Sequence, residues 1–407
     1  MTVSFFYIGK KEVGLKVLNE IFFSLLRLGL SADSQSFFLD VDVSQDDWKK
    51  MYSLASRLAV VGIAYAGICK LPKDRRPPLD LAFQWASEAE AIRGHNRLVN
   101  DEARRLTELF AGEGRRTAIL KGAANARLYP DRFMRQCGDI DIWISGGRDS
   151  VVELLDRMDL LEKDAPSVPG HKMTYEEKYA EAKRKLNVKV SGHHVHLAHD
   201  AAAVTVEAHF LPSSGNLNPF TNKRLMKFLN DEISKTELVP EGFYVPSLKF
   251  ALAMQLSHIQ RHFMAGGIGL KQITDYYVLL QLANDSDRLE IAKNLRTFGL
   301  LRVAKALMWV LGHIYGLERD CMLCEPSERY GKWMLEVILE GGNFGHYFKA
   351  QNGSFVTWWF GKRWRSIKMS PFSLTDVFWA EVAYWKIFWR SIPVRIKLRR
   401  LSIRDLF

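Results

Sequence analysis

The sequence lacks the features that mark secreted and membrane-spanning proteins. It has only four cysteines in 407 residues, far too few for a disulfide scaffold. Its first residues show no basic leader followed by an apolar core and a small-residue cleavage site. No apolar run reaches the ~20 residues that a membrane-spanning helix needs. We therefore expect a soluble protein of a reducing compartment, the cytoplasm.

The sequence also lacks an excess of positive charge that is spread along its whole length. The formal net charge is +11, but residues 361–407 hold eleven Lys and Arg against three Asp and Glu, and so carry +8 of it. The rest of the chain is close to charge-balanced, which argues against nucleic-acid binding over the whole surface. Apolar residues make up 47% of the chain, enough to build a sizeable core.

The order of the local patterns predicts a mixed α+β protein, with a small mixed β-sheet core flanked by helical regions. Apolar residues recur at helical spacing before residue 115 and again after Pro246, while short β-favouring stretches lie between. The predicted units are a helical N-terminal region (1–115), an α/β core (116–245), a helical C-terminal domain (246–340) and a basic, tryptophan-rich helical tail (341–407). Residues 162–190 are a polar, charge-rich insert in the core.

Two aspartates stand at alternate positions of the strand predicted for residues 139–144. Residues two apart on a strand face the same side, so Asp139 and Asp141 lie together, and two neighbouring carboxylates are costly without a cation. Residues 193–200 and 203–210 predict two more strands joined by a turn, and the second supplies a third acid, Glu207. Three carboxylates suit Mg²⁺, which takes oxygen ligands and substrate phosphates.

A predicted strand-to-helix turn upstream of the acids offers a place for phosphate. Lys121 and Gly122 end the apolar stretch at 117–120, and a short helix-forming stretch follows. A helix N-terminus presents free N–H groups and the positive end of its dipole to an anion, and glycine lets the backbone approach closely. Lys121, Arg132 and Arg135 add positive charge, either for phosphate or for a salt bridge to the acids.

These residues belong to an ordered set of motifs that resembles a known family. The motifs are Leu120-Lys121-Gly122, Arg135-Gln136-Cys137-Gly138-Asp139-Ile140-Asp141, Val206-Glu207-Ala208-His209, His258-Ile259-Gln260-Arg261-His262-Phe263, Gly269-Leu270-Lys271-Gln272 and Asp275. Over residues 45–285 the chain resembles bacterial uncharacterised nucleotidyltransferase-family proteins of the polymerase-β-type nucleotidyltransferase superfamily. Its turn at Gly122 departs from the wider superfamily because no serine stands beside the glycine.

The resemblance implies transfer of a nucleoside monophosphate from a nucleoside triphosphate (NTP) to a hydroxyl acceptor. It implies catalytic and metal-binding roles, with Mg²⁺ or Mn²⁺ as cofactor, for Asp139, Asp141 and Glu207. It implies nucleotide contacts at Lys121, Gly122, Arg135 and Gly138, and substrate contacts at His209, His258, His262 and Lys271. His209 shares a strand face with Glu207, so its alternative role is to support that carboxylate. Some members of this group lie beside polysaccharide genes. The sequence does not choose among ATP, CTP, GTP and UTP.

Two other classes of function stay open. The chain is also compatible with a non-catalytic binding module on the same fold, held at a membrane or a polysaccharide-synthesis complex. A toxin-like enzyme that modifies RNA or protein is a third hypothesis. Metal-dependent NTP binding separates the first two classes, and growth arrest on expression would favour the third.

Several histidines and cysteines have two interpretations each. His194 and His196 share a strand face near His193 and His199, which suits either a transition-metal site or a polar strand beside the acids. His258 and His262 are one helical turn apart, a spacing compatible with a metal, with substrate contact or with packing beside the cleft. Cys321 and Cys324 form a lone CxxC, either a zinc or redox site or an incidental pair.

The tail interleaves aromatic and basic residues from 358 to 407. This composition suits a helix docked on the body by its aromatic face, or peripheral contact with an anionic membrane surface such as the inner membrane face. Stacking on nucleic acid or a protein partner is a third interpretation.

Overall fold

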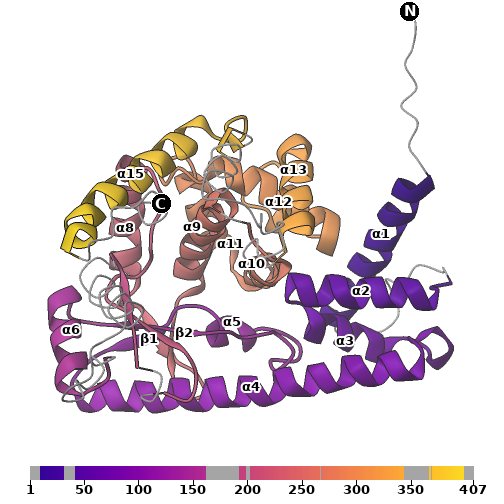
Figure 1. Cartoon of the computed structure of the whole chain (residues 1–407), viewed down its shortest axis with the longest axis horizontal. Coiled ribbons are helices and arrows are strands. Elements are labelled where there is room, and N and C mark those ends of the chain that lie inside the picture. The colour runs from indigo at the N-terminus through magenta and orange to yellow at the C-terminus, as the bar shows by residue number, and fades with distance from the viewer. Residues whose placement is uncertain are drawn as a thin grey trace, which may run out of the picture.

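The computed structural model describes residues 10–31, 42–161, 192–198, 202–265, 267–342, 366–367 and 369–397 (Figure 1). Its helices are α1 (Lys10–Leu30), α2 (Gln45–Leu58), α3 (Val61–Lys70), α4 (Leu79–Gly112), α5 (Ala123–Ala126), α6 (Arg148–Arg157), α8 (Pro219–Glu232), α9 (Leu248–Ala265), α10 (Leu270–Leu282), α11 (Asp285–Asn294), α12 (Leu301–Tyr315), α13 (Glu328–Gly341) and α15 (Leu374–Lys397), with 3₁₀ turns at Lys73–Arg75 and Arg319–Cys321. Its strands are β1 (Thr117–Ile119), β2 (Ile140–Ile144), β3 (His194–His196), β4 (Val206–His209), β5 (Thr236–Leu238) and β6 (Tyr244–Pro246).

A four-stranded mixed sheet has the order β1-β2-β4-β3. The central strands β2 and β4 run parallel, and the edge strands β1 and β3 are antiparallel to their neighbours. A separate two-stranded sheet pairs β5 with β6. The small mixed sheet between helical flanks confirms the predicted α+β fold class.

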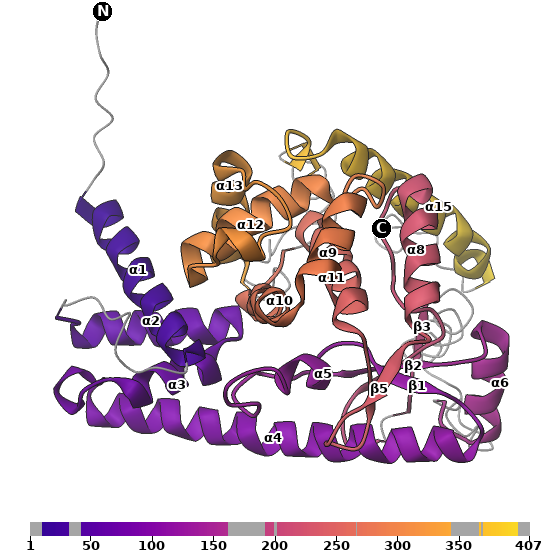
Figure 2. The same ribbon diagram turned by 180° about the vertical axis from the view of Figure 1, so that it is seen from behind.

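The two faces of the sheet differ because apolar and polar residues alternate along its central strands. Ile140, Ile142 and Ile144 of β2 point into a buried core with apolar residues of α4 and α6. In Figure 1 the long helix α4 runs along the bottom of the molecule beneath the sheet, and Figure 2 shows the same arrangement from behind. The polar residues of β2 and β4 therefore face the opposite side, toward α9.

The helices at the two ends of the chain share a second core. Buried apolar residues of α1, α2 and α3 belong to the same cluster as those of α9, α10, α12 and α13. Arg27 of α1 also donates hydrogen bonds to the last carbonyls of α12, with Nε 2.6 Å from Ile314 O and Nη2 2.6 Å from His313 O. The boundaries proposed at 115, 245 and 340 stay predictions, and packing joins the first and third regions.

The loop from 130 to 138, which leads into the first aspartate, is held by the N-terminal helices. Asn96 of α4 donates from Nδ2 to the carbonyls of Phe133 (2.7 Å) and Arg135 (2.8 Å). The Gln136 side chain accepts from the backbone N–H of Val61 at the start of α3. At Gly62 a Cβ would lie 2.2 Å from the Met134 carbonyl oxygen, so only glycine permits this approach.

A buried ion pair fixes the same loop to α10. Arg135 Nη2 lies 2.6 Å from Asp275 Oδ2 and Arg135 Nε lies 3.0 Å from Asp275 Oδ1, a two-point contact. Both side chains are less than 5% exposed, and the Tyr129 hydroxyl donates to Asp275 at 2.7 Å. Burial alone raises the pKa of Asp275, but the Arg135 charge and these hydrogen bonds hold it below its usual value of 3.8.

The C-terminal helix α15 docks on α9 and α8. Asp376 accepts a hydrogen bond from Gln260 of α9 at 3.1 Å, and the Trp379 ring packs edge-on against Phe220 of α8. Phe378 and Trp389 on this helix are exposed. Docking thus accounts for part of the tail, while the membrane, nucleic-acid and protein-partner interpretations stay predictions. Among the helices of the described segments, none is both long and apolar enough to cross a membrane.

Three features of the sequence fall outside the described residues. They are the insert at 162–190, His199, and the parts of the tail at 343–365 and 398–407.

We expect Asp275→Asn to lower the free energy of unfolding by about 3–5 kcal/mol, because it leaves the buried Arg135 charge without a counter-ion. The control Asp231→Asn breaks the exposed Lys227–Asp231 pair on α8 (3.0 Å), which is worth about 0–1 kcal/mol. Urea denaturation measures both. Small and equal losses in the two variants would contradict the central role of the buried pair.

The same pair has a defined pH dependence. Because the pKa of Asp275 is lower in the folded protein than its usual 3.8, its ionised form stabilises the fold fully above that pH, and this contribution is lost as the pH falls below it. The difference in stability between wild type and Asp275→Asn should therefore shrink on acidification below about pH 4.

Candidate active site

A cavity of about 370 Å³ lies between the polar face of the sheet and helix α9. Asp141 and Glu207 of the sheet line it, together with Asp139, which directly precedes β2. The helix contributes Met254, His258, Arg261 and His262. A smaller hollow on the other side of Lys121 is lined by Gly122, Arg135, Gly138 and Lys271. All the residues predicted from the motifs therefore lie in or beside two adjoining hollows.

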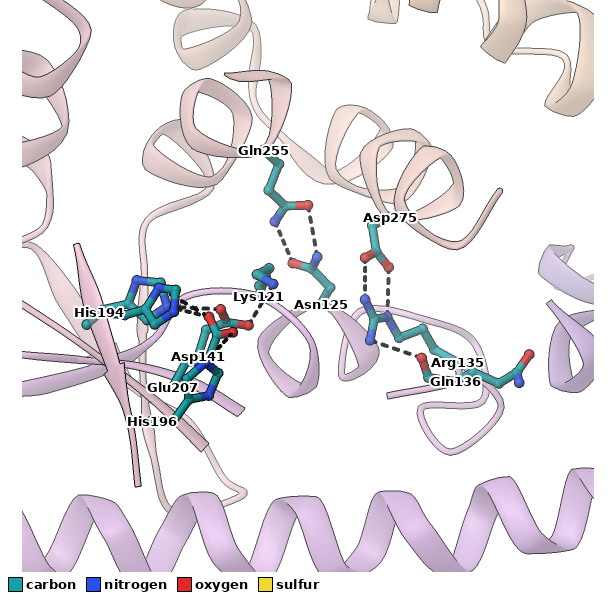
Figure 3. Close-up of polar contacts among 11 residues, drawn as sticks. Lys121, Asn125, Arg135, Gln136, Asp141, His194, His196, Glu207, Gln255 and Asp275 are labelled. Atoms are coloured by element: carbon teal, nitrogen blue, oxygen red, sulfur yellow. Dashed lines mark hydrogen bonds and ion pairs between the residues drawn. The ribbon is translucent and has the colours of Figure 1, made fainter. Parts of the chain in front are cut away.

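Two of the three predicted acids are direct neighbours on parallel strands. Asp141 of β2 stands opposite Glu207 of β4 in the register, so strand alternation points both side chains to the cavity. His209 lies two residues beyond Glu207 on the same face. Its Nε2 is 3.0 Å from Asp141 Oδ1 and 3.3 Å from Glu207 Oε2, so the imidazole bridges the two carboxylates. Figure 3 shows the Asp141 and Glu207 side chains lying together, with Lys121 beside Asp141.

Lys121 supplies a second positive group to Asp141. Its Nζ lies 2.8 Å from Asp141 Oδ2, so each carboxylate oxygen of Asp141 already has one partner. Burial opposes ionisation of Asp141, but Lys121 and His209 outweigh it and hold the pKa of Asp141 well below its usual range. The same contacts raise the pKa of Lys121 and of His209 against the effect of burial.

Asp139 lies at the edge of this cluster. It directly precedes β2 and lines both hollows, but its carboxylate belongs to neither group of three ligand atoms found within 4.8 Å of one another in the described residues. Burial, and then the negative charge of Asp141, raise the pKa of Asp139. Among the described residues no cationic group lies within 4.0 Å of this carboxylate, so it is the acid with the least compensation.

Four other histidines of the cavity, unlike His209, are predominantly neutral at pH 7. Burial lowers the pKa of His193 to about 3 and that of His262 to about 4, and it lowers the pKa of His258 and His194 as well. The rings of His258 and His262 lie 4.2 Å apart and form part of the cavity wall. Both are thus placed for substrate contact, which stays a prediction.

Of the basic residues predicted to contact phosphate, Arg135 does not pair with Asp139, Asp141 or Glu207. Its guanidinium is taken by Asp275, which favours the salt-bridge interpretation but with a different partner from the predicted acids. Arg132 pairs with Glu241 at 2.8 Å, away from both hollows. Lys271 stays in the smaller hollow, where burial and then the Arg135 charge lower its pKa to about 8. An anion there would find two lysines, Lys121 and Lys271.

Some residues of the site were not predicted. Asn125 and Gln255 exchange two amide hydrogen bonds of 2.9 Å, which fasten α5, and so the Gly122 turn, to α9. Arg261 lines the cavity and donates to the Ser214 carbonyl at 3.0 Å. Arg261 stood inside the His258–Phe263 motif, which was a usable signal. The amide pair had no local signal, because its partners are 130 residues apart.

Cys321 and Cys324 are free thiols, both half-buried. Neither belongs to a potential metal-binding group among the described residues, so nothing there supports a zinc site.

The turn at Gly122 gives a direct test of local strain. Gly122 has φ +65° and ψ −108°, a conformation that residues with a Cβ avoid. We expect Gly122→Ala to cost about 1–3 kcal/mol of unfolding free energy. A Cβ would lie 3.5 Å from the Asp139 carbonyl oxygen and 3.9 Å from Arg135 Nη1, both ordinary van der Waals distances, so the cost comes from the backbone rather than from a clash.

The matched control is Gly94→Ala, in the middle of α4 with no atom within 4 Å of an added Cβ. This substitution should stabilise the protein by about 0.5–1 kcal/mol, because alanine favours the helix. Thermal and urea unfolding of both variants measure the difference. Effects of the same sign would contradict the strain at Gly122.

Comparison with known proteins adds an independent finding. A family model described as uncharacterised nucleotidyltransferase matches residues 44–316, which span α2 to the end of α12 and include every predicted site residue. No curated protein matches the chain. The matched region covers about two thirds of the sequence, and the chain therefore belongs to this family of uncharacterised nucleotidyltransferases.

Proposed function

We propose that this protein transfers a nucleoside monophosphate from an NTP to a hydroxyl acceptor, with Asp139, Asp141 and Glu207 as the metal-binding acids. The observation that carries the proposal is the pairing of Asp141 with Glu207 across parallel strands, facing a cavity beside Lys121 and Gly122. Family membership supports the reaction class.

The residues present fit a Mg²⁺ or Mn²⁺ ion. Carboxylate oxygens are the ligands that these hard ions prefer. Asp139 and Asp141 raise the cost of ionising each other, and a divalent cation relieves that repulsion. Each oxygen of Asp141 has one hydrogen-bond partner and two acceptor positions, so Lys121 and His209 leave room for an ion.

The chain's own residues divide the work between the two hollows. The smaller hollow, with a volume of about 30 Å³ and a lining that includes Lys121, Lys271 and Gly122, suits one phosphate group of the NTP. The larger one, with Glu207 and the histidines, suits the acceptor. When bound, the metal neutralises phosphate charge and acidifies the acceptor hydroxyl.

The bond changes follow from this placement. The acceptor oxygen forms a bond to the α-phosphorus as the bond to the bridging oxygen breaks, and pyrophosphate leaves toward Lys121 and Lys271. Glu207 takes the acceptor proton. Positioning and charge stabilisation account for most of the rate in such phosphoryl transfers.

A label-transfer assay tests the reaction. Each α-³²P-labelled NTP is incubated with Mg²⁺ or Mn²⁺, the full chain and a cell extract as the source of acceptor. We expect transfer with the wild type and a loss of at least about 100–1,000-fold in Asp139→Asn/Asp141→Asn, because charge stabilisation of this kind is worth that much. Asp231→Asn, on the exposed face of α8, is the control and should transfer normally.

No transfer under any condition, together with no metal-dependent NTP binding by the folded protein, would overturn the enzymatic proposal. The non-catalytic binding module would then be the better account.

Lys121 gives a second test, because it neutralises Asp141 in the absence of nucleotide. We expect Lys121→Met to bind Mn²⁺ more tightly without nucleotide, since a competing positive charge is gone. The same variant should bind NTP more weakly, since a phosphate partner is gone. Isothermal titration calorimetry measures both affinities, and a parallel fall in both would contradict the proposed role of Lys121.

A further inference from the structure

The edge strand β3 places two histidines on the face of the sheet that carries the acids. In its antiparallel pairing with β4, His194 stands opposite His209, and His196 stands opposite Glu207. Between the two histidines, Val195 points into the apolar core below the sheet. Strand alternation therefore puts both imidazoles on the side of Glu207.

The distances suit a single ion between these side chains. His194 Nδ1 lies 3.5 Å from Glu207 Oε2, and His196 Nε2 lies 4.0 Å from Glu207 Oε1. The three ligand atoms all lie within 4.8 Å of one another (Figure 3). Two ligands that each bind one ion at ~2.1 Å are about 3–4 Å apart, so small side-chain rotations close this set around a cation.

The chemistry of this set differs from that of the three acids. Two imidazoles and one carboxylate favour a divalent transition metal such as Zn²⁺, Co²⁺ or Fe²⁺, whereas Mg²⁺ prefers oxygen ligands alone. The His196 side chain is 51% exposed, which gives an ion a route from solvent.

We propose that His194, His196 and Glu207 form a transition-metal site, separate from the all-carboxylate position and joined to it through Glu207. Three protein ligands leave open positions for water or for an oxygen of the acceptor. The site stands on the geometry of β3 and β4 alone, so it does not depend on nucleotidyl transfer.

The alternative is an ordinary histidine–glutamate contact without a metal. The chain contains such a contact elsewhere, between His313 Nε2 of α12 and Glu20 Oε1 of α1 at 3.2 Å. No potential metal-binding group of three in the described residues includes this pair. His313 is therefore the matched control.

The experiment uses the full chain, stripped of metal by a chelator and then held in excess Mg²⁺ to occupy oxygen-only positions. Co²⁺ is titrated in and followed by calorimetry and by its visible absorption. The variants are His196→Ala, whose half-exposed position spares the core, and His313→Ala. Thermal unfolding establishes that both are folded.

We expect the wild type to bind one Co²⁺ in the presence of Mg²⁺, and His196→Ala to weaken this binding at least about 10–100-fold, the cost of losing even an indirect support of a metal. His313→Ala should bind like the wild type. Equal affinity of His196→Ala and wild type, or no Co²⁺ binding at all, would overturn the proposal. Failure of the label-transfer assay would leave this result unaffected, so the two proposals fail separately.

Discussion

The buried pair between Arg135 and Asp275 is the contact on which the geometry of the site depends. It joins the loop that precedes β2 to α10, across 140 residues of sequence, with both side chains nearly inaccessible to water. Removing two charges from water costs desolvation free energy on the order of several kcal/mol for each ion. The two-point contact and the hydrogen bond from the Tyr129 hydroxyl offset this cost only when the three side chains keep this geometry. The pair thus sets where Asp139 and Asp141 stand relative to α9, which lines both hollows, and to α10, which lines the smaller one.

The helical N-terminal region acts on the same loop from the other side. Asn96 holds two of its carbonyls and the start of α3 holds Gln136, so three elements distant in sequence define a loop without regular structure. A loop fixed this way holds catalytic side chains more precisely than a free one. The N-terminal helices contribute no residue to the larger cavity, but they hold the loop that leads to its acids.

The parts of the fold that were predictable from sequence are those with a local pattern. The alternation of apolar and polar residues predicts strand β2 and the side of the sheet to which Asp141 points. The apolar neighbours of Glu207 predict strand β4. The ordered set of motifs predicts one site that includes Lys121, Gly122 and the histidines of α9, and these residues line the two adjoining hollows. The partners of Arg135 and Asn125 were not predictable, because a charge or an amide specifies that a partner exists and not where in the chain it lies. The core that α1, α2 and α3 share with α9, α10, α12 and α13 was not predictable either, because an apolar helix face does not specify which distant helix covers it.

That shared core has a consequence for how the chain is made. Arg27 and its partner Ile314 are 287 residues apart, and α1 packs against α12 as well as against the nearby α3. At the usual 5–20 residues per second of synthesis, roughly 15–60 s pass between the appearance of α1 and that of α12. For that interval Phe23 of α1, whose ring lies 5.9 Å from that of His313 in α12, lacks its final partner. The nascent chain therefore carries early an apolar segment of the kind that chaperones bind, and its folding ends only when its C-terminal helices emerge.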